Sequence, residues 1–265
     1  MRQIVTADID ARPLAAGRIA VGLSSFVVLV EWFGTLNRVA GGAIAVPVAS
    51  ALPDPSPTGV YVLACVGFLA SVGMVLGLSR WPTLAVAAVS LCALLLDQQT
   101  YSNHLVLLTV LAFFLGLSGS HRAWSIPHRH AGARVPYWPA FLIQAQISTL
   151  YFWTGVAKLN EQFLTGGVFE INMHTWALPP AALLPVVAVS SVITEVALSV
   201  LLWVRRLFPV ALLVGVGLHL GIAVTLKSPI PLVAFAGLMA SGYFLFGYRW
   251  WSGRRRVVAD ASDPS

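Results

Sequence analysis

Eight long apolar stretches constrain this chain more than any other feature of its sequence. They lie near residues 14–36, 59–79, 81–96, 103–119, 139–158, 181–204, 207–226 and 229–248. An α-helix needs roughly 17–25 apolar residues to cross the hydrocarbon core of a bilayer. Only 10% of the 265 residues are charged, against about 25% in a soluble domain. The sequence therefore predicts an all-α, polytopic membrane helix bundle of about eight transmembrane helices.

The basic residues give these predicted helices a direction. Cytoplasmic loops of membrane proteins carry an excess of Lys and Arg. With the N-terminus inside, twelve arginines fall in inner segments, and only Arg38 and Lys227 fall in outer loops. We therefore expect both termini to be cytoplasmic, in a multi-pass protein of the cell (plasma) membrane. The basic residues do not cluster beside aromatics as in nucleic-acid-binding proteins, so we expect the lipid bilayer, and no nucleic acid, as partner.

The lengths of the connections predict the domain organisation. We divide the chain into a cytoplasmic N-terminal segment (1–13), a transmembrane domain (14–250) and a basic, disordered cytoplasmic tail (251–265). The longer loops, at 37–58, 120–136 and 159–180, are too short to be domains, so we expect no soluble domain outside the spans. Cys65 and Cys92 lie in apolar stretches without metal-binding spacing, which argues against a disulfide or a metal site.

Ionisable residues within the apolar stretches are the first candidates for a functional site. A charge at membrane depth is costly and is therefore retained mainly where it has a role. The six such residues are Arg18, Glu31, His104, Lys158, Glu195 and His219. We expect Arg18 to extend to lipid phosphate at the inner surface. Glu31 has two interpretations, a functional role and an ion pair with Arg38.

The predicted topology gathers several of these residues in one half of the bundle. Four of the six fall in the outer half on four different helices, and Glu195 falls near mid-membrane; the four are Glu31, His104, Lys158 and His219. A second pattern joins them in the fifth stretch. Gln144, Ser148, Tyr151 and Lys158 are spaced by 4, 3 and 7 residues, which places them on one helical face. Such a polar stripe indicates a helix that lines a hydrated or ligand-filled cavity.

Lys158, at the end of this stripe, has two interpretations. An amine removed from water loses its preference for the charged form, and the free amine can act as a general base. Alternatively, Lys158 forms an ion pair with Glu195 or extends outward, which would be a structural role. The two conflict, because a carboxylate partner stabilises the ammonium form.

The other four histidines lie in two predicted loops. His121, His128 and His130 fall in the inner loop among arginines, and we expect this loop to contact anionic lipid rather than a metal. His174 lies in an outer loop close to Trp176, where we expect it at the mouth of the cavity.

Three segments resemble a known family. Asn103-His104 begins an apolar stretch, residues 151–160 read Tyr-Phe-Trp-Thr-Gly-Val-Ala-Lys-Leu-Asn, and His219 lies in Gly-Leu-His-Leu-Gly. This pattern resembles the membrane part of the vitamin K-dependent gamma-carboxylase family, and most closely its bacterial branch, the horizontally transferred transmembrane (HTTM) domain proteins. The resemblance covers about residues 14–250, and Gly155–Asn160 is its most specific part.

The resemblance implies roles for the candidate residues. Lys158 matches the family lysine regarded as the base that deprotonates reduced vitamin K, and His104 and His219 match active-site histidines. Reduced vitamin K or menaquinol would be the cofactor, without a metal, and O2 and CO2 the co-substrates, in a bacterial inner membrane. The expected cofactor-binding residues are Asn103, Tyr151, Gln144, Ser148 and Glu195. The carboxylase has a large extramembrane portion and a second lysine at the position of Ala157.

Three functions remain open at this point. The first is a quinol-dependent oxygenase or carboxylase-like enzyme with Lys158 as general base. The second is a non-catalytic membrane partner in the maturation or export of a secreted peptide, since the HTTM branch resembles proteins of the sporulation-delaying protein B type. The third is a transporter, for which the sequence shows neither repeat symmetry nor paired broken helices. A single cavity lined by Lys158, His104 and His219 would favour the enzyme.

Overall fold

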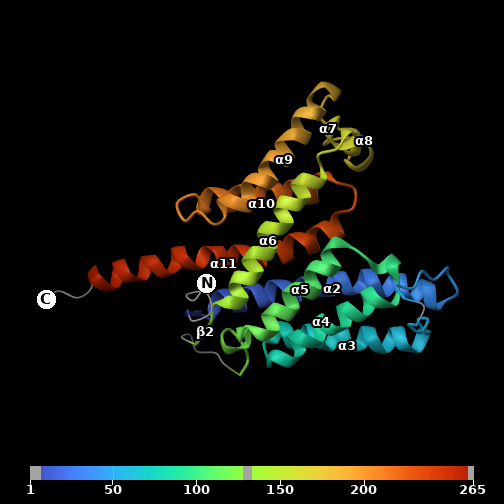
Figure 1. Ribbon diagram of the computed structural model, residues 1–265, viewed down its shortest axis with the longest axis horizontal. Helices are drawn as coiled ribbons and strands as arrows, with labels where there is room; N and C mark the ends of the chain where they lie inside the picture. The colour runs from blue at the N-terminus through green and yellow to red at the C-terminus, as the bar shows by residue number, and fades with distance from the viewer. Residues whose placement is uncertain (1–6, 50, 128–132, 262–265) are drawn as a thin grey trace. The chain divides into compact units, whose positions relative to one another are not determined.

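A computed structural model of the protein describes residues 7–49, 51–127 and 133–261, with side chains up to Tyr248. A helix occupies each of the eight apolar stretches (Figure 1). These helices are α2 (Arg12–Ala40), α3 (Pro57–Leu76), α4 (Arg80–Leu96), α5 (Asn103–Leu117), α6 (Trp138–Ala157), α9 (Leu184–Leu201), α10 (Phe208–Thr225) and α11 (Pro229–Ala261). The predicted all-α class is confirmed.

Among the described residues, five helical segments are long and apolar enough to cross a membrane. They are Arg12–Ala40, Pro57–Leu76, Ala181–Leu201, Phe208–Thr225 and Pro229–Tyr248. The helices Arg80–Leu96 and Asn103–Leu117 are apolar but shorter. A polytopic membrane bundle is thus confirmed, whereas the number of crossings and the cytoplasmic position of both termini stay predictions.

The chain forms two compact units, each described by itself. Unit 1 comprises Met1–Ile143 and Val233–Ser241, and unit 2 comprises Gln144–Leu232 and Gly242–Ser265. Two helices, α6 and α11, contribute residues to both units.

Unit 1 is built on α2, α3, α4 and α5, which pack side by side (Figure 1). Small residues allow this close packing. Ser25 of α2 donates a hydrogen bond to Ser71 of α3 at 2.7 Å. A side chain at Gly116 of α5 would overlap Leu84 of α4. Small residues and hydroxyl pairs are typical of helix contacts in membranes, where close approach replaces the hydrophobic driving force.

The ends of the unit 1 helices follow from local sequence. Ser56 and Ser102 cap α3 and α5, accepting hydrogen bonds from Gly59 N at 3.1 Å and Leu105 N at 3.3 Å. Serine is favoured there because its hydroxyl satisfies an otherwise free N–H of the first helical turn. Helix α3 ends at Gly77, whose φ of +66° is a left-handed conformation that glycine adopts without strain.

Two loop contacts in unit 1 join segments that the sequence analysis treated as separate. Strand β1 (Asp8–Asp10) pairs antiparallel with β2 (Arg134–Pro136). In a second contact, the fully buried Asp97 accepts hydrogen bonds from Val46 N and Gln99 N, both at 2.8 Å. The carboxylate of Asp97 therefore ties the loop after α2 to the loop between α4 and α5.

Arg18 corrects one prediction. It is fully buried and does not extend to lipid phosphate. Its guanidinium donates to the carbonyls of Val75 at 2.8 Å and Trp124 at 2.7 Å, and to that of Met74. The last carbonyls of a helix have no partner within the helix and carry partial negative charge. The end of α3 and the loop at Trp124 thus supply the acceptors that the sequence analysis expected from lipid.

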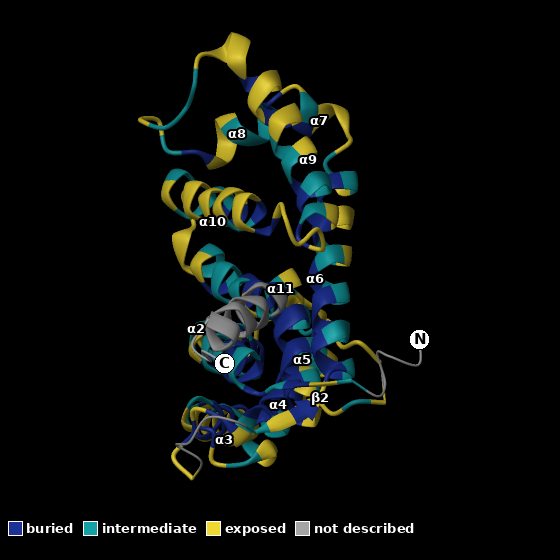
Figure 2. Cartoon of the chain, turned by 90° about the vertical axis from the view of Figure 1, so that its left-hand side faces the viewer, coloured by how far each residue is buried: buried dark blue, intermediate teal, exposed yellow. Residues whose placement is uncertain are grey.

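Unit 2 contains the rest of α6, the short helices α7 (Glu161–Leu164), α8 (Gly167–Asn172) and η3 (Ala181–Leu183), then α9, α10 and both ends of α11. Phe163 of α7 packs with Ala188 and Val192 of α9 in a small apolar core. Helix α10 exposes much of its apolar surface (Figure 2), including Leu213. An exposed apolar face is expected where a helix contacts lipid tails.

Two predictions concern residues at the limits of the described structure. Helix α11 continues to Ala261, through most of the tail for which the sequence predicts disorder. His128 and His130 of the inner loop lie outside the described residues.

Candidate functional site

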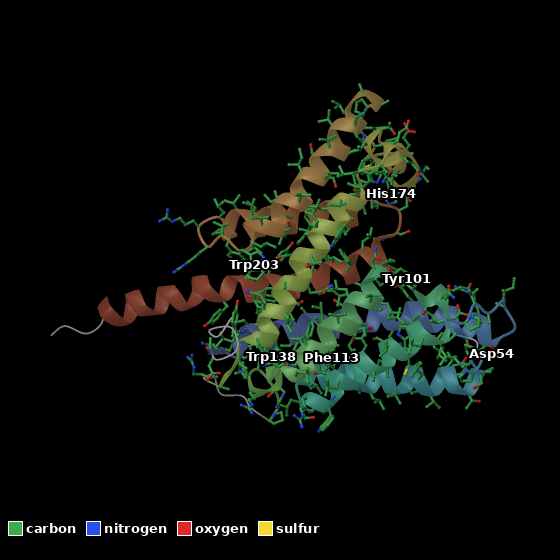
Figure 3. All side chains as sticks on the ribbon, viewed as in Figure 1. Asp54, Tyr101, Phe113, Trp138, His174 and Trp203 are labelled. Atoms are coloured by element: carbon green, nitrogen blue, oxygen red, sulfur yellow. The ribbon has the colours of Figure 1, made fainter. Side chains whose placement is uncertain are left out.

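The polar stripe of α6 faces other elements of unit 2. Gln144 is buried, and its Nε2 donates to the carbonyl of Leu245 at 3.1 Å. Ser148 accepts a hydrogen bond from the indole of Trp203, labelled in Figure 3, at 2.7 Å. Protein partners from the end of α9 and from α11 therefore account for the first two polar positions of the stripe.

Lys158, just beyond the end of α6, forms an ion pair. Its Nζ lies 2.7 Å from Oε1 of Glu195 and 3.2 Å from Oγ of Ser191, both on α9. The ammonium also lies 5.2 Å from the centre of the Phe163 ring, within range of a cation–π interaction. The ion-pair interpretation of Lys158 describes this geometry.

A glycine permits the close approach of α6 and α9 that this pair requires. A Cβ at Gly155 would lie 2.8 Å from a methyl carbon of Val196 and 3.4 Å from the carbonyl oxygen of Val192. Gly155 is one turn before Lys158, and Val192 and Val196 flank Glu195. The Gly-Val-Ala-Lys segment therefore brings the lysine to the carboxylate.

One oxygen of Glu195 has no partner among the described residues. The side chain is 8% exposed, and Oε2 is buried without a hydrogen bond. Buried carboxylate oxygens nearly always accept a hydrogen bond from protein or water. The free oxygen lies on the same carboxylate that holds Lys158 and has an unused capacity to accept a hydrogen bond.

A second polar cluster joins three helices of unit 2. The Tyr151 hydroxyl of α6 lies 2.8 Å from Nε2 of His219 on α10 and is also hydrogen-bonded to the Tyr243 hydroxyl on α11. All three side chains are buried. Tyr151 lies seven residues, about two helical turns, before Lys158. Both clusters belong to unit 2, and together they are its candidate site.

The sequence analysis missed Tyr243 of this cluster, and it also missed Trp203, the partner of Ser148. Tyr243 is neutral at ordinary pH and lies in an apolar stretch, so a search for charged residues passes over it. A usable signal is the run Ser241-Gly242-Tyr243, in which small and hydroxyl-bearing residues interrupt the apolar stretch.

His104 belongs to unit 1 and has its own partner there. Its Nε2 pairs with Oε2 of Glu31 on α2, so the expected alternative pairing of Glu31 with Arg38 is not formed. Arg38 donates instead to the Thr35 hydroxyl at 3.4 Å. Asn103, the first residue of α5, is exposed.

The candidate residues thus form two separate groups by unit. Lys158, Glu195, Tyr151 and His219 come together in unit 2, whereas His104 lies in unit 1. The single cavity shared by Lys158, His104 and His219 stays a prediction.

The remaining histidines of the sequence analysis lie elsewhere. His174, labelled in Figure 3, stacks on Trp176 with ring centres 6.1 Å apart, and its backbone N–H donates to the Thr225 carbonyl at 2.9 Å. Among the described residues, no group of three or more His, Cys, Asp or Glu side chains is arranged to hold a metal.

Comparison with known proteins agrees with the resemblance seen in the three segments. No solved structure matches the chain. The family model described as HTTM domain matches residues 7–227, a range that includes His104, Lys158, Glu195 and His219. Because the match covers most of the sequence and the fold is a bundle of apolar helices, the chain is an integral membrane protein that belongs to the HTTM domain family.

Proposed function

We propose that this protein is a membrane enzyme that oxidises a lipid quinol, such as menaquinol or reduced vitamin K, with O2. The carrying observation is the buried Glu195 carboxylate, which pairs with Lys158 through one oxygen and leaves the other without a partner. The resemblance to the quinol-oxidising core of the gamma-carboxylase family supports the same substrate class.

The geometry favours the Lys158–Glu195 pair, rather than Lys158 alone, as the base. A quinol hydroxyl would donate to Glu195 Oε2 and pass its proton to the pair. The Lys158 side chain is 24% exposed, so its ammonium can also approach the quinolate oxygen and stabilise the negative charge. Deprotonation makes the quinol a stronger electron donor. Transfer of two electrons and two protons to O2 gives the quinone and hydrogen peroxide. Alternatively, one oxygen atom of O2 is inserted into the ring as the quinone epoxide, and the other leaves as water with the two quinol protons.

This proposal is tested by oxygen consumption. Purified protein in lipid nanodiscs is mixed with menaquinol or reduced vitamin K, and O2 uptake and quinone products are measured. We expect Lys158→Ala to abolish uptake and Glu195→Gln to lower it by about a hundredfold, the scale of general acid–base catalysis. Lys227→Ala is the matched control, because Lys227 is an exposed lysine of unit 2 that donates to the Ile171 carbonyl. Equal uptake by wild type and Lys158→Ala would contradict the proposal.

The geometry of the same ion pair also supports a second candidate function. In this function the protein is a non-catalytic partner in the maturation or export of a secreted peptide. Lys158 lies 2.7 Å from the Glu195 carboxylate and also donates to Ser191. In this second candidate, its role is the structural one of joining α6 to α9. In that case no O2 uptake would be seen with any quinol. Lys158→Ala would then impair release of the peptide only as far as it lowers the amount of folded protein.

A further inference from the structure

A buried chain of hydrogen bonds lies beside the Lys158–Glu195 pair. It runs from the Tyr243 hydroxyl to the Tyr151 hydroxyl and on to Nε2 of His219. Two arrangements of its protons satisfy the two hydrogen bonds. In one, Tyr243 donates to Tyr151 and Tyr151 donates to His219; in the other, His219 donates to Tyr151 and Tyr151 donates to Tyr243. Such a chain can pass a proton by changing from one arrangement to the other.

The chain shares α6 with the ion pair, since Tyr151 lies seven residues, about two helical turns, before Lys158. Tyr243 lies at the end of the chain opposite His219, and it contributes its hydroxyl from α11.

Gly215 of α10 provides the space that the Tyr243 hydroxyl occupies. A Cβ at this position would overlap Oη of Tyr243 and lie 2.9 Å from its Cζ. Glycine in a helix interior costs about 1 kcal/mol relative to alanine, so its presence requires a reason. At Gly217 and Gly221 of the same helix, a Cβ would meet nothing within 4 Å. The requirement for glycine at 215 is thus specific to the tyrosine.

We propose that Tyr243 is a positioning residue of the candidate site, which acts through Tyr151 to set the proton arrangement of His219, and that Gly215 is required for this contact. The role of this chain in turnover rests on the proposed quinol oxidation. The hydrogen-bond coupling itself does not rest on it.

The coupling is tested without turnover. Protein labelled with ¹⁵N-histidine is examined by NMR, and His219→Gln assigns the His219 signals among the six histidines. Tyr243→Phe removes the Tyr243 hydroxyl, and Gly215→Ala displaces that hydroxyl by adding a methyl group on α10. We expect both variants to shift the His219 nitrogen signals in the same direction. Gly217→Ala is the matched control and should leave them unchanged. Unchanged His219 signals in both test variants would overturn the proposal.

The role in turnover is tested on the same proteins by O2 uptake with menaquinol. We expect Tyr243→Phe and Gly215→Ala to lower kcat about tenfold, within the range of proton-transfer effects, with little change in KM and an altered solvent deuterium isotope effect. An equal loss in Gly217→Ala, or a loss that follows thermal stability alone, would overturn this role. If wild type consumes no O2 while the NMR shifts are present, the proposed function fails and the coupling stands.

Discussion

Each of the two units contains a carboxylate that pairs with a basic side chain from another helix and leaves its second oxygen without a partner. In unit 1 the pair is Glu31 with His104, and in unit 2 it is Glu195 with Lys158. The surroundings differ. The Glu31 side chain is 29% exposed, whereas that of Glu195 is 8% exposed, and the lysine that pairs with Glu195 also donates to Ser191. Unit 2 therefore has the stronger candidate site.

Unit 1 satisfies its other buried charges in a different way. Arg18 is bound by backbone carbonyls, and Asp97 is bound by backbone N–H groups. The backbone cannot change its protonation state in response to a ligand, so these charges hold the fold together. A buried charge in a membrane bundle is thus a good candidate for chemistry when other side chains surround it.

The largest expected effect breaks a structural charge of unit 1. Arg18→Met leaves the carbonyls of Val75 and Trp124 without their donor, whereas that of Met74 keeps its hydrogen bond from Gly77 N at 3.1 Å. Each unpaired buried group is costly. We expect the free energy of unfolding to fall by about 4 kcal/mol, measured by denaturation in detergent micelles. Arg38→Met, which removes an exposed arginine of the same helix, is the control. Similar losses in the two variants would show that the burial of Arg18 contributes little.

A smaller effect is expected for the pair in unit 2. Lys158→Met leaves Glu195 as an uncompensated buried carboxylate and should cost about 3 kcal/mol. Adding Glu195→Gln to the same protein removes the unpaired charge, so the double variant should recover most of that stability while O2 uptake stays absent. A double variant no more stable than Lys158→Met would mean that the two side chains are not coupled.

The smallest effect is expected for the pair in unit 1. Glu31→Gln keeps a hydrogen-bond acceptor for His104, and the position is partly exposed, so stability should fall by about 1 kcal/mol or less. The ¹⁵N signals of His104 should change, whereas those of His219 should stay as in wild type. A change at His219 would remove the distinction between the two pairs.

The apolar stretches predicted the helices well because the length needed to cross a bilayer is set by the bilayer. The partners of the charged residues were harder to predict. Glu31 and His104 are 73 residues apart in the sequence, so a local pattern could not identify their pairing. Arg18 was misread because its acceptors are backbone carbonyls, which leave no trace in residue type. The Lys158–Glu195 pair was anticipated as one of two alternatives, since both residues were rare charges in apolar stretches.

The contacts between distant backbone segments carry a consequence for how the chain is threaded through the bilayer. Two segments joined by backbone hydrogen bonds must lie on the same side, so the chain between them crosses an even number of times. The pairing of β1 with β2 applies this rule to α2 through α5. The bond from Gln98 N to the Val46 carbonyl, at 2.8 Å, applies it to α3 and α4, and the bridge between Met173 and Leu226 applies it to α9 and α10. In each case the number of helices between the joined segments is even, as the arrangement predicted from the count of arginines requires.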